Sequence, residues 1–351
     1  MTVKPGAFRF NTDSMKLEIF RGSSNYNGSA SMAGIGTLAA GQWEEIQVTS
    51  PEVQTGGARG LFAGGYSPTN PSQSNVIGYI NIDSTGNAID FGDLTVARIA
   101  LGGLASRTRG VFGGGFVTPT NQDTIDFVTI TSTGNATDFG NLTTARHWVQ
   151  PGSSSTRGLF AAGNGASGHL NTIDYVTIAS TGNAVNFGDI SYLASVTSGS
   201  GCSSSTRTIF GGGNEPGGSA LNTIEFVTTS TLGNTSDFGD FTIGRAREGR
   251  VSNATRGVFG GGHGFVNTID YITIATLGNA TNFGDLTSSR GNLAGCSSPI
   301  RGCFGGGQTP TNLNTIDYVK IMTTGNAVDF GDMTIVSNHL AGCSNGHGGL
   351  G

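Results

Sequence analysis

The sequence predicts an all-β protein assembled from repeated, four-stranded antiparallel sheets, and three observations carry this prediction. A unit of about 48 residues recurs in six clear copies, which is a period typical of closed repeat arrays. The chain has 60 glycines among 351 residues but no three-residue glycine period, which excludes collagen. Its apolar positions are largely β-branched or aromatic and are separated by Gly, Thr, Ser and Asn, a composition that disfavours helices.

Each repeat contains four short runs that read as strands. In residues 292–333 these runs are LAGCSS, RGCFGGG, NTIDYVKIM and NAVDFGDM. A Gly-Asn pair recurs between the third and fourth runs, and it predicts a two-residue type II′ hairpin turn. The third run, for example TIDYITI at 268–274, is apolar on both faces, so the sheet is predicted to be packed on both sides, as a propeller blade is.

An acidic residue recurs among the apolar residues of the third run and is predicted to be buried. A buried carboxylate needs a partner, and an arginine recurs at the start of the second run. We therefore predict structural pairs in most blades: Arg109 with Asp126, Arg157 with Asp174, Arg207 with Glu225, Arg256 with Asp270, and Arg301 with Asp317. The first repeat has Gly78 at the acidic position. The alternative is a ring of catalytic or metal-binding acids, which is disfavoured because five blades present their acids to five different interfaces.

Phenylalanine and cysteine are assigned to packing. Two positions per repeat account for twelve of the 20 phenylalanines, and we expect these side chains to pack between blades. Cys202, Cys296 and Cys343 occupy equivalent positions, and Cys303 lies close to Cys296 in the chain. We expect all four to be small buried hydrophobic residues rather than ligands or disulfide partners.

The repeat resembles the kelch repeat. Glycines 260–262 match the glycine run that closes the second kelch strand, Tyr271 the tyrosine of the third strand, Phe283 the tryptophan position and Arg290 the arginine that follows it. The sequence departs from the pattern in having Phe for Trp and in losing the last arginine at Ala194 and Ser337. The resemblance covers residues 51–345 and implies a β-propeller; it implies little about function, because propellers have many functions.

A second resemblance concerns the N-terminal segment. GAFRFNTDSMKLEIFRG, followed later by QWEEI, is similar to a segment common in structural proteins of tailed bacteriophages, often in fibres. The whole chain resembles repeat proteins of marine cyanophages. This resemblance implies a component of the virion, on the extracellular face of the phage particle, with other virion proteins as partners.

The chain ends predict how the ring closes. Residues 1–50 contain three strand-like runs that fit the second to fourth strands of a blade, residues 51–338 hold the six repeats, and residues 339–351 supply one extra first strand. Joining the two ends predicts a seventh blade of four antiparallel strands. The alternative is six blades plus an N-terminal β-hairpin module that docks on a partner. The sequence leaves open whether the chain forms a homo-oligomer.

Charge and motifs exclude several functions. The net charge is −5 with no basic tract, which argues against nucleic-acid binding, and no run of 18 apolar residues predicts a membrane span. The five histidines form no metal-spaced cluster, and the glycine runs end strands rather than opening helices, so we expect no metal, cofactor or phosphate loop. Near-equal repeats also argue against an enzyme.

The loops between the second and third strands differ in every repeat, whereas the turns on the opposite side are nearly identical. Variable loops on a rigid scaffold are where recognition usually occurs. The candidate binding residues in these loops are Tyr66, Phe116, Asn164, His169, His263, Phe265 and Gln308. Arg98, Arg146, Arg245 and Arg290 are expected to begin on the same side and either to brace the loops or to bind anionic groups. These features predict a structural virion protein or, alternatively, an adhesin for a host surface glycan or protein.

Overall fold

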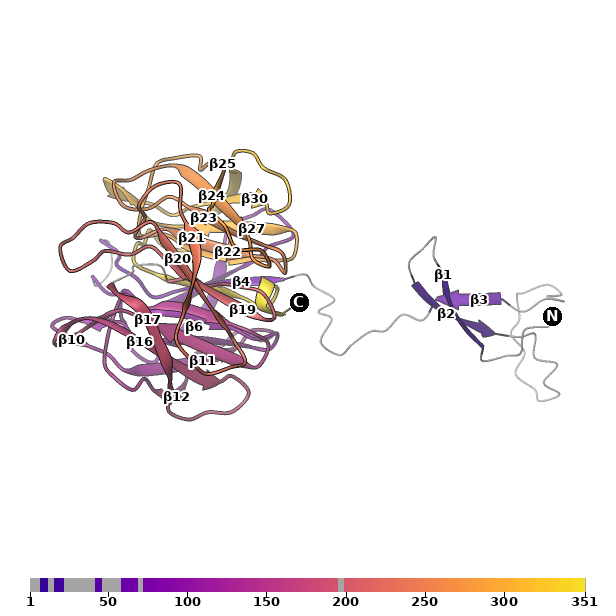
Figure 1. Cartoon of the computed structure of the whole chain (residues 1–351), viewed down its shortest axis with the longest axis horizontal. Helices are drawn as coiled ribbons and strands as arrows, with labels where there is room; N and C mark the ends of the chain where they lie inside the picture. The colour runs from indigo at the N-terminus through magenta and orange to yellow at the C-terminus, as the bar shows by residue number, and fades with distance from the viewer. Residues whose placement is uncertain are drawn as a thin grey trace. The chain divides into compact units, whose positions relative to one another are not determined.

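The computed structural model describes residues 7–11, 16–21, 42–45, 58–68, 72–194 and 199–350. The chain divides into two compact units, Met1–Gln54 and Thr55–Gly351. Figure 1 shows the first unit with strands β1 to β3 and the second with the remaining strands.

The first unit contains a three-stranded antiparallel sheet. Its strands are β1 (Phe8–Asn11), β2 (Lys16–Arg21) and β3 (Gln42–Glu45), in the order β1-β2-β3. Phe8 lies opposite Ile19, and Phe20 lies opposite Trp43. The three predicted runs therefore form strands, but they pair with one another in a sheet of their own.

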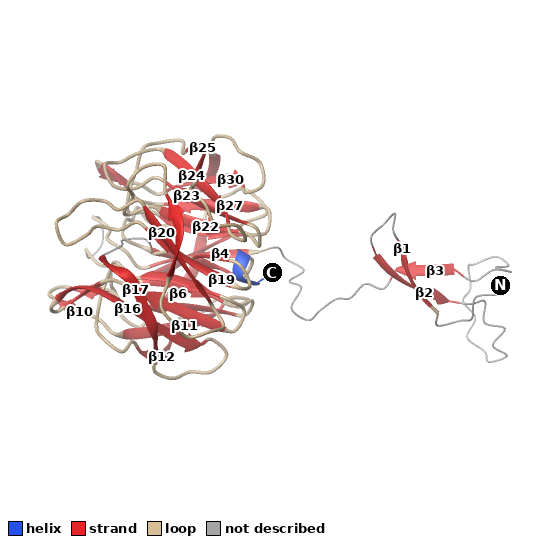
Figure 2. Ribbon diagram, viewed as in Figure 1, coloured by secondary structure: helices blue, strands red, loops and turns tan. Residues whose placement is uncertain are grey.

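The second unit is a propeller of six blades, each built on four antiparallel strands, with one short extra strand paired to the sheet of blade 3 (Figure 2). From the axis outwards, the strands of blade 1 are β32 (Ala341–Ser344), β4 (Arg59–Ala63), β5 (Val76–Asn81) and β6 (Ile89–Asp93). In the same order, the strands of blade 2 are β7 (Gly102–Ala105), β8 (Arg109–Gly113), β11 (Thr124–Thr129) and β12 (Thr137–Asn141). The strands of blade 3 are β13 (Gln150–Ser153), β14 (Arg157–Ala161), β16 (Gly168–Thr177) and β17 (Val185–Ala194). The strands of blade 4 are β18 (Cys202–Ser203), β19 (Arg207–Gly211), β20 (Thr223–Thr228) and β21 (Ser236–Asp240). The strands of blade 5 are β22 (Gly249–Ser252), β23 (Arg256–Gly260), β24 (Thr268–Thr273) and β25 (Thr281–Asp285). The strands of blade 6 are β26 (Ala294–Ser297), β27 (Arg301–Gly305), β30 (Thr315–Lys320) and β31 (Val328–Asp332).

Short additional elements decorate the blades. The loops between the second and third strands contain β9 (Phe116–Val117), β10 (Thr120–Asn121), β15 (Asn164–Gly165), β28 (Gln308–Thr309) and β29 (Thr311–Asn312). A single turn of 3₁₀ helix, η1 (Gly348–Leu350), lies near the C-terminus and is blue in Figure 2.

The C-terminal strand closes the ring within the first repeat. β32 pairs with β4, so that Ala341 lies opposite Ala63 and Ser344 opposite Gly60. The first repeat begins at its second strand, and β32 fills the vacant innermost position. The alternative of six blades is therefore confirmed. The predicted seventh blade is wrong, because the C-terminal strand already has its partner in β4.

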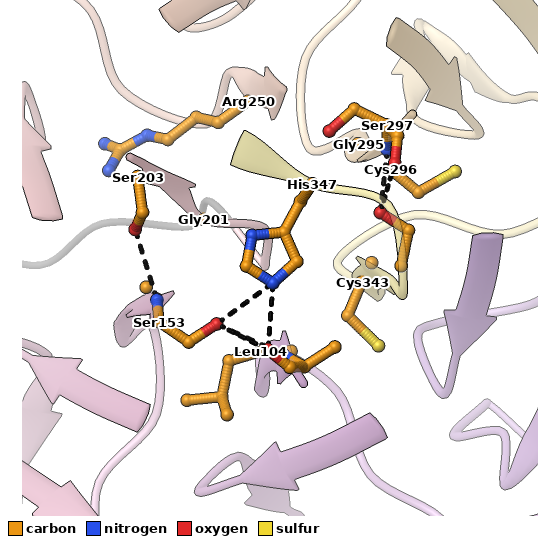
Figure 3. Close-up of a pocket in the computed structure, with 15 residues that line it drawn as sticks. Leu104, Ser153, Gly201, Ser203, Arg250, Gly295, Cys296, Ser297, Cys343 and His347 are labelled. Atoms are coloured by element: carbon orange, nitrogen blue, oxygen red, sulfur yellow. Dashed lines mark hydrogen bonds between the residues drawn. The ribbon is translucent and has the colours of Figure 1, made fainter. Parts of the chain in front are cut away.

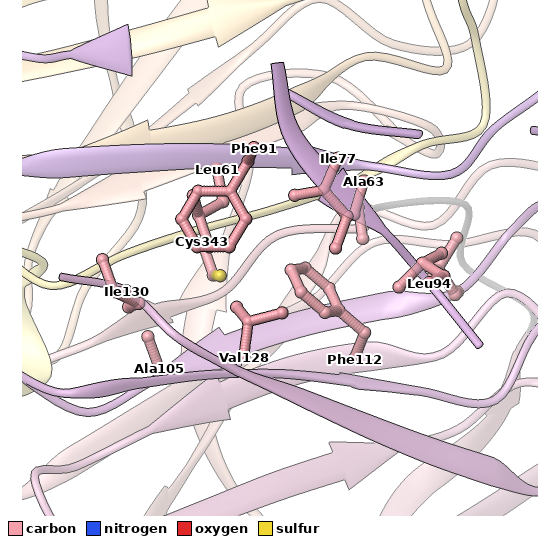
Figure 4. Packing of buried hydrophobic residues seen from close by; sticks show 12 residues of the cluster. Leu61, Ala63, Ile77, Phe91, Leu94, Ala105, Phe112, Val128, Ile130 and Cys343 are labelled. Atoms are coloured by element: carbon pink, nitrogen blue, oxygen red, sulfur yellow. The ribbon is translucent and has the colours of Figure 1, made fainter. Parts of the chain in front are cut away.

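The apolar core lies between neighbouring blades. The cluster in Figure 4 joins Phe91 of blade 1 to Phe112 and Val128 of blade 2, and it includes Cys343 from the closing strand. Both phenylalanine positions are buried, as predicted. Glycine makes room for this packing: a Cβ on Gly113 would lie 2.7 Å from the ring of Phe160 in the next blade. The four cysteines are free and buried, which confirms their prediction.

The recurring Gly-Asn pair interlocks the blades. It is not the two-residue hairpin that was predicted, because the third and fourth strands are separated by longer connections, such as residues 274–280 between β24 and β25. Instead, the Asn135 side chain of blade 2 accepts a 3.0 Å hydrogen bond from the Asp93 N–H of blade 1, and Gly134 N–H donates to the Phe91 carbonyl. The same contact closes the ring, where Asn87 accepts from Asp332.

Candidate functional site

The variable loops and the linkers between blades lie on the same side of the propeller, as predicted. Each of four loops forms a β-bridge with a linker: Phe116 with Ile99, Asn164 with His147, Gln308 with Gly291, and Tyr66 with Asn338. We call this side, formed by the second-to-third-strand loops and the blade linkers, the linker face. The opposite side carries the Gly-Asn turns that interlock the blades.

The structure places the predicted loop residues at different depths in this face. Tyr66, His263 and Phe265 are exposed, and Phe116, Asn164, His169 and Gln308 are half-buried. The Phe116 ring lies 5.1 Å from the His147 ring, whose own neighbour at 4.5 Å is Trp148. His147 and Trp148, which the sequence analysis did not select, lie in the linker between blades 2 and 3 and form one aromatic cluster with the blade 2 loop.

The four candidate arginines are buried partners of the recurring acids. Arg98 contacts Asp126 at 2.9 Å, Arg146 contacts Asp174 at 3.0 Å, Arg245 contacts Asp270 at 2.9 Å and Arg290 contacts Asp317 at 3.0 Å, with all eight side chains fully buried. Each arginine begins in the linker after one blade and reaches the third strand of the next. These arginines are already neutralised, so they brace the linkers and are not free to bind an external anion.

The acids also hold the linker by hydrogen bonds. Asp126 accepts from the Thr95 hydroxyl at 2.6 Å, and Asp270 accepts from the Thr242 hydroxyl at the same distance. Burial lowers the pKa of the Arg98 guanidinium, and the Asp126 carboxylate opposes that effect. The ion pair thus ties one blade to the next at full burial, where removing either partner would leave an uncompensated charge.

The predicted pairing partner was therefore wrong, although the acids are buried as expected. Arg109, Arg157, Arg207, Arg256 and Arg301 lie instead over the aromatic ring of the third strand in their own blade, 4.5–4.8 Å from its centre. They also donate to a carbonyl of the next blade, as Arg109 does to Ile178 at 3.0 Å. The half-buried positions of these arginines allow a cation–π contact and a blade-to-blade hydrogen bond.

Two interfaces lack this ion pair. Between blades 6 and 1, Ser337 replaces the arginine and Gly78 replaces the acid, so both charges are lost together. A Cβ on Gly78 would lie 3.2 Å from the Thr334 hydroxyl, which shows that the linker still reaches the same place. Between blades 3 and 4, Ala194 replaces the arginine but Glu225 remains, and it accepts hydrogen bonds from Ser191 and from the Thr235 hydroxyl.

A ring of linker residues surrounds the axis on the linker face, and sequence reasoning missed it. Its members share left-handed backbone angles, with φ between 52° and 70°, two residues before the innermost strand begins: Ala100, Trp148, Arg247, Asn292 and His339. Backbone hydrogen bonds of 2.8–3.0 Å connect four successive pairs in the order Trp148, Ala100, His339, Asn292 and Arg247. We call these five residues the axial ring. The left-handed conformation costs a non-glycine residue about 1–2 kcal/mol.

The axial ring carries unlike side chains, and its histidine is neutral. Burial, and then the positive charge of Arg247, lowers the pKa of His339 to about 4. Burial likewise lowers the pKa of nearby His147 to about 4. The only sequence signal for the ring was a linker position at which the repeats disagree, and variation alone does not reveal a backbone conformation.

The axis below this ring is filled by the chain itself. The Gly199 carbonyl accepts hydrogen bonds from Gly103 N–H and Gly342 N–H, which belong to blades 2 and 1. At the far end the C-terminal tail inserts His347, whose Nε2 lies 2.8 Å from the Ala105 carbonyl and 3.3 Å from the Ser153 hydroxyl (Figure 3). The remaining space is about 20 Å³, room for little more than a water molecule.

Among the described residues no three His, Cys, Asp or Glu side chains gather as a metal would require, and no helix is long and apolar enough to cross a membrane. No protein-family model matches the chain, and no curated protein matches it. The site with the most varied side chains in the described part of the chain is the linker face, where the loops of different blades lie on one side of the propeller.

Proposed function

We propose that the chain is a non-enzymatic interaction protein of a tailed-phage particle, in which the propeller recognises a partner through its linker face. The observation that carries this proposal is a difference between the two sides of the propeller. The Gly-Asn side is committed to interlocking the blades, whereas the linker face carries loops that differ in every repeat and expose Tyr66 and Phe265. Variable loops on a rigid scaffold suit recognition.

The division of the chain into two units supports separate roles. The first unit, Met1–Gln54, contains the segment that resembles phage structural proteins, and we assign it to incorporation into the particle among other virion proteins. The second unit, Thr55–Gly351, is then the recognition module. This assignment would place the chain on the extracellular face of the virion.

A second candidate function is attachment to a host surface glycan or protein. Exposed aromatic side chains favour it, because rings such as those of Tyr66 and Phe265 supply large, rigid contact area at little entropic cost. Both candidates use the same face and differ in the partner.

The test compares the two sides of one blade. Phe265 lies in the linker-face loop of blade 5, and Leu277 lies in the opposite turn of the same blade with 59% of its side chain exposed. We expect Phe265→Ala, combined with Tyr66→Ala, to reduce incorporation into particles or adsorption to host cells without lowering the melting temperature. Leu277→Ala is the matched control and should change neither. A larger effect of Leu277→Ala would show that the wrong face was chosen.

Particle composition separates the two candidates. Particles that lack the altered protein would indicate an assembly role for the linker face. Particles that contain it in normal amount but adsorb poorly would indicate a host partner.

A further inference from the structure

The C-terminal tail lies directly against the backbone at the far end of the axis. We call residues 345–350 the axial seal. A Cβ on Gly348 would collide with the Asn253 carbonyl oxygen, and a Cβ on Gly349 with that of Ser153. These carbonyls belong to blades 5 and 3, so the seal crosses the axis and fits there because two of its residues have no side chain.

His347 holds the seal in place through both of its ring nitrogens. Its Nε2 lies 2.8 Å from the Ala105 carbonyl, and its Nδ1 lies 3.1 Å from the Gly349 nitrogen. A carbonyl can only accept and an N–H can only donate, so the ring carries one proton, on Nε2, and accepts at Nδ1. A second proton on Nδ1 would point at the Gly349 N–H and break that hydrogen bond. The Leu350 N–H also donates to the His347 carbonyl, at 3.1 Å.

The groups around this imidazole would not compensate an added proton. Among the described residues that line the spaces beside it, the charged side chains are those of Arg107 and Arg250, and no carboxylate is among them. The thiols of Cys296 and Cys343 line the same space and stay neutral, because burial raises the pKa of each. A protonated ring would therefore be held beside positive charge without a counter-ion.

Solvent can reach the ring while the blades remain folded. His347 is half-buried, and it lines a hollow of about 140 Å³ together with Asn253, Pro299 and Leu350. Burial lowers the pKa of His347 to about 4, and the positive charge of Arg107 acts in the same direction. The closed seal thus favours the neutral ring, whereas a released seal would let the ring take up a proton near pH 6.5.

We propose that the axial seal is released by acid: protonation of His347 breaks its hydrogen bond with Gly349 and frees residues 345–350 while the six blades stay folded. The strand β32 ends at Ser344, before the seal, so it can keep its pairing with β4. Release uncovers the carbonyls at the far end of the axis. This device lies at the opposite end of the axis from the linker face and does not depend on the function proposed for that face.

Hydrogen exchange of the full chain, read by mass spectrometry on the peptide 345–351, tests the release. Rates at pH 7 and pH 4 are corrected for the pH dependence of the exchange chemistry itself. With a pKa of about 4 when closed and about 6.5 when released, the equilibrium constant for opening should rise about 100-fold between pH 7 and pH 4. The amides of β23, Arg256–Gly260, should keep their protection over the same range.

Two histidine variants separate release from a general effect of acid. His347→Gln keeps one donor and one acceptor but cannot take up a proton, so opening of its seal should change less than about threefold with pH. His147→Gln is the matched control, because it removes another histidine whose pKa is about 4, on the linker face, and it should keep the full response. The inference is wrong if the seal of the unaltered chain opens less than about tenfold more at pH 4. It is equally wrong if β23 loses protection together with the seal, or if the seal of His347→Gln responds to acid like that of the unaltered chain.

Discussion

The buried pair Arg245–Asp270 allows a sharp test of how the blades are held together. Asp270 forms an ion pair with Arg245 at 2.9 Å and accepts hydrogen bonds from Arg245 Nε at 3.2 Å and from the Thr242 hydroxyl at 2.6 Å, and both charged side chains are fully buried. We consider Asp270→Gly, Arg245→Ser and the double variant. The double variant copies the combination of Gly78 and Ser337 that the interface between blades 6 and 1 already contains.

Asp270→Gly alone should destabilise the protein more than the double variant does. Arg245 would keep the Gly261 and Thr268 carbonyls as acceptors, at 2.8 and 3.0 Å, but its buried charge would lose its counter-ion. Breaking a buried ion pair from one side costs about 3–5 kcal/mol. At about 2 °C for each kcal/mol in a chain of this size, the melting temperature should fall by roughly 6–10 °C. The double variant removes the stranded charge and should recover about 1–3 kcal/mol of this loss.

Calorimetry and guanidinium unfolding of the four proteins would measure these differences. The expected result is a double variant more stable than Asp270→Gly alone, with a coupling energy clearly different from zero. If the losses of the two single variants simply add in the double variant, the two charges do not compensate each other and our account of the interface is refuted.

Three further outcomes are expected. Deleting residues 338–351 removes β32 and should open the ring, so the protein should aggregate and its melting temperature should fall. Deleting only residues 345–351 leaves β32 in place and should lower the melting temperature less. Equal falls in melting temperature would contradict closure by this strand. Burial lowers the pKa of His347 to about 4, so between pH 6.5 and 4 the unfolded chain takes up a proton that the folded chain does not. The free energy of unfolding should therefore fall as the pH drops through this range. His347→Gln should remove up to about 3 kcal/mol of that fall, as measured by unfolding at a series of pH values. Asn279→Ala deprives the Asp240 N–H of its 3.0 Å acceptor and should cost about 1 kcal/mol in denaturant unfolding, and no loss would mean that the Gly-Asn turn does not interlock the blades.

Local pattern was enough to predict the repeating blade. Strand alternation, glycine runs and paired phenylalanines act over a few residues, so the four strands of each repeat and the burial of Phe91 and Phe112 could be predicted from the sequence. The common side of the variable loops and linkers also followed, because the chain direction reverses at every strand of a meander.

The closure could not be decided in the same way. The strand-like run at 341–344 suited either a seventh blade with the N-terminal strands or the vacant inner position of the first repeat. Each arrangement gives the run an antiparallel partner, an N-terminal strand in one and residues 59–63 in the other, and only the number of blades that packs into a closed ring separates them. The structure gives that position to β32 beside β4.

The arginine that pairs with each buried acid also could not be predicted, because the pair joins the linker after one blade to the third strand of the next. Asp126 lies 17 residues after Arg109 and 28 after Arg98. The Arg109 position is arginine in all six repeats and the Arg98 position in four, so recurrence alone favoured the wrong partner. The sequence determined that the carboxylate is buried and needs a cation. The tertiary structure decided which cation, because the linker carries Arg98 into the interior of the next blade while Arg109 points to the carbonyls beyond its own aromatic ring.

The axial ring depended on tertiary structure entirely. Ala100, Trp148, Arg247, Asn292 and His339 share no side-chain chemistry, and what unites them is a backbone angle imposed where each linker turns towards the axis. Repetition in the sequence therefore determined the scaffold, since identical residues in six copies must serve the contacts that every blade makes. The axial ring is made of residues that differ between copies, and only the closing of the propeller connects them through backbone hydrogen bonds.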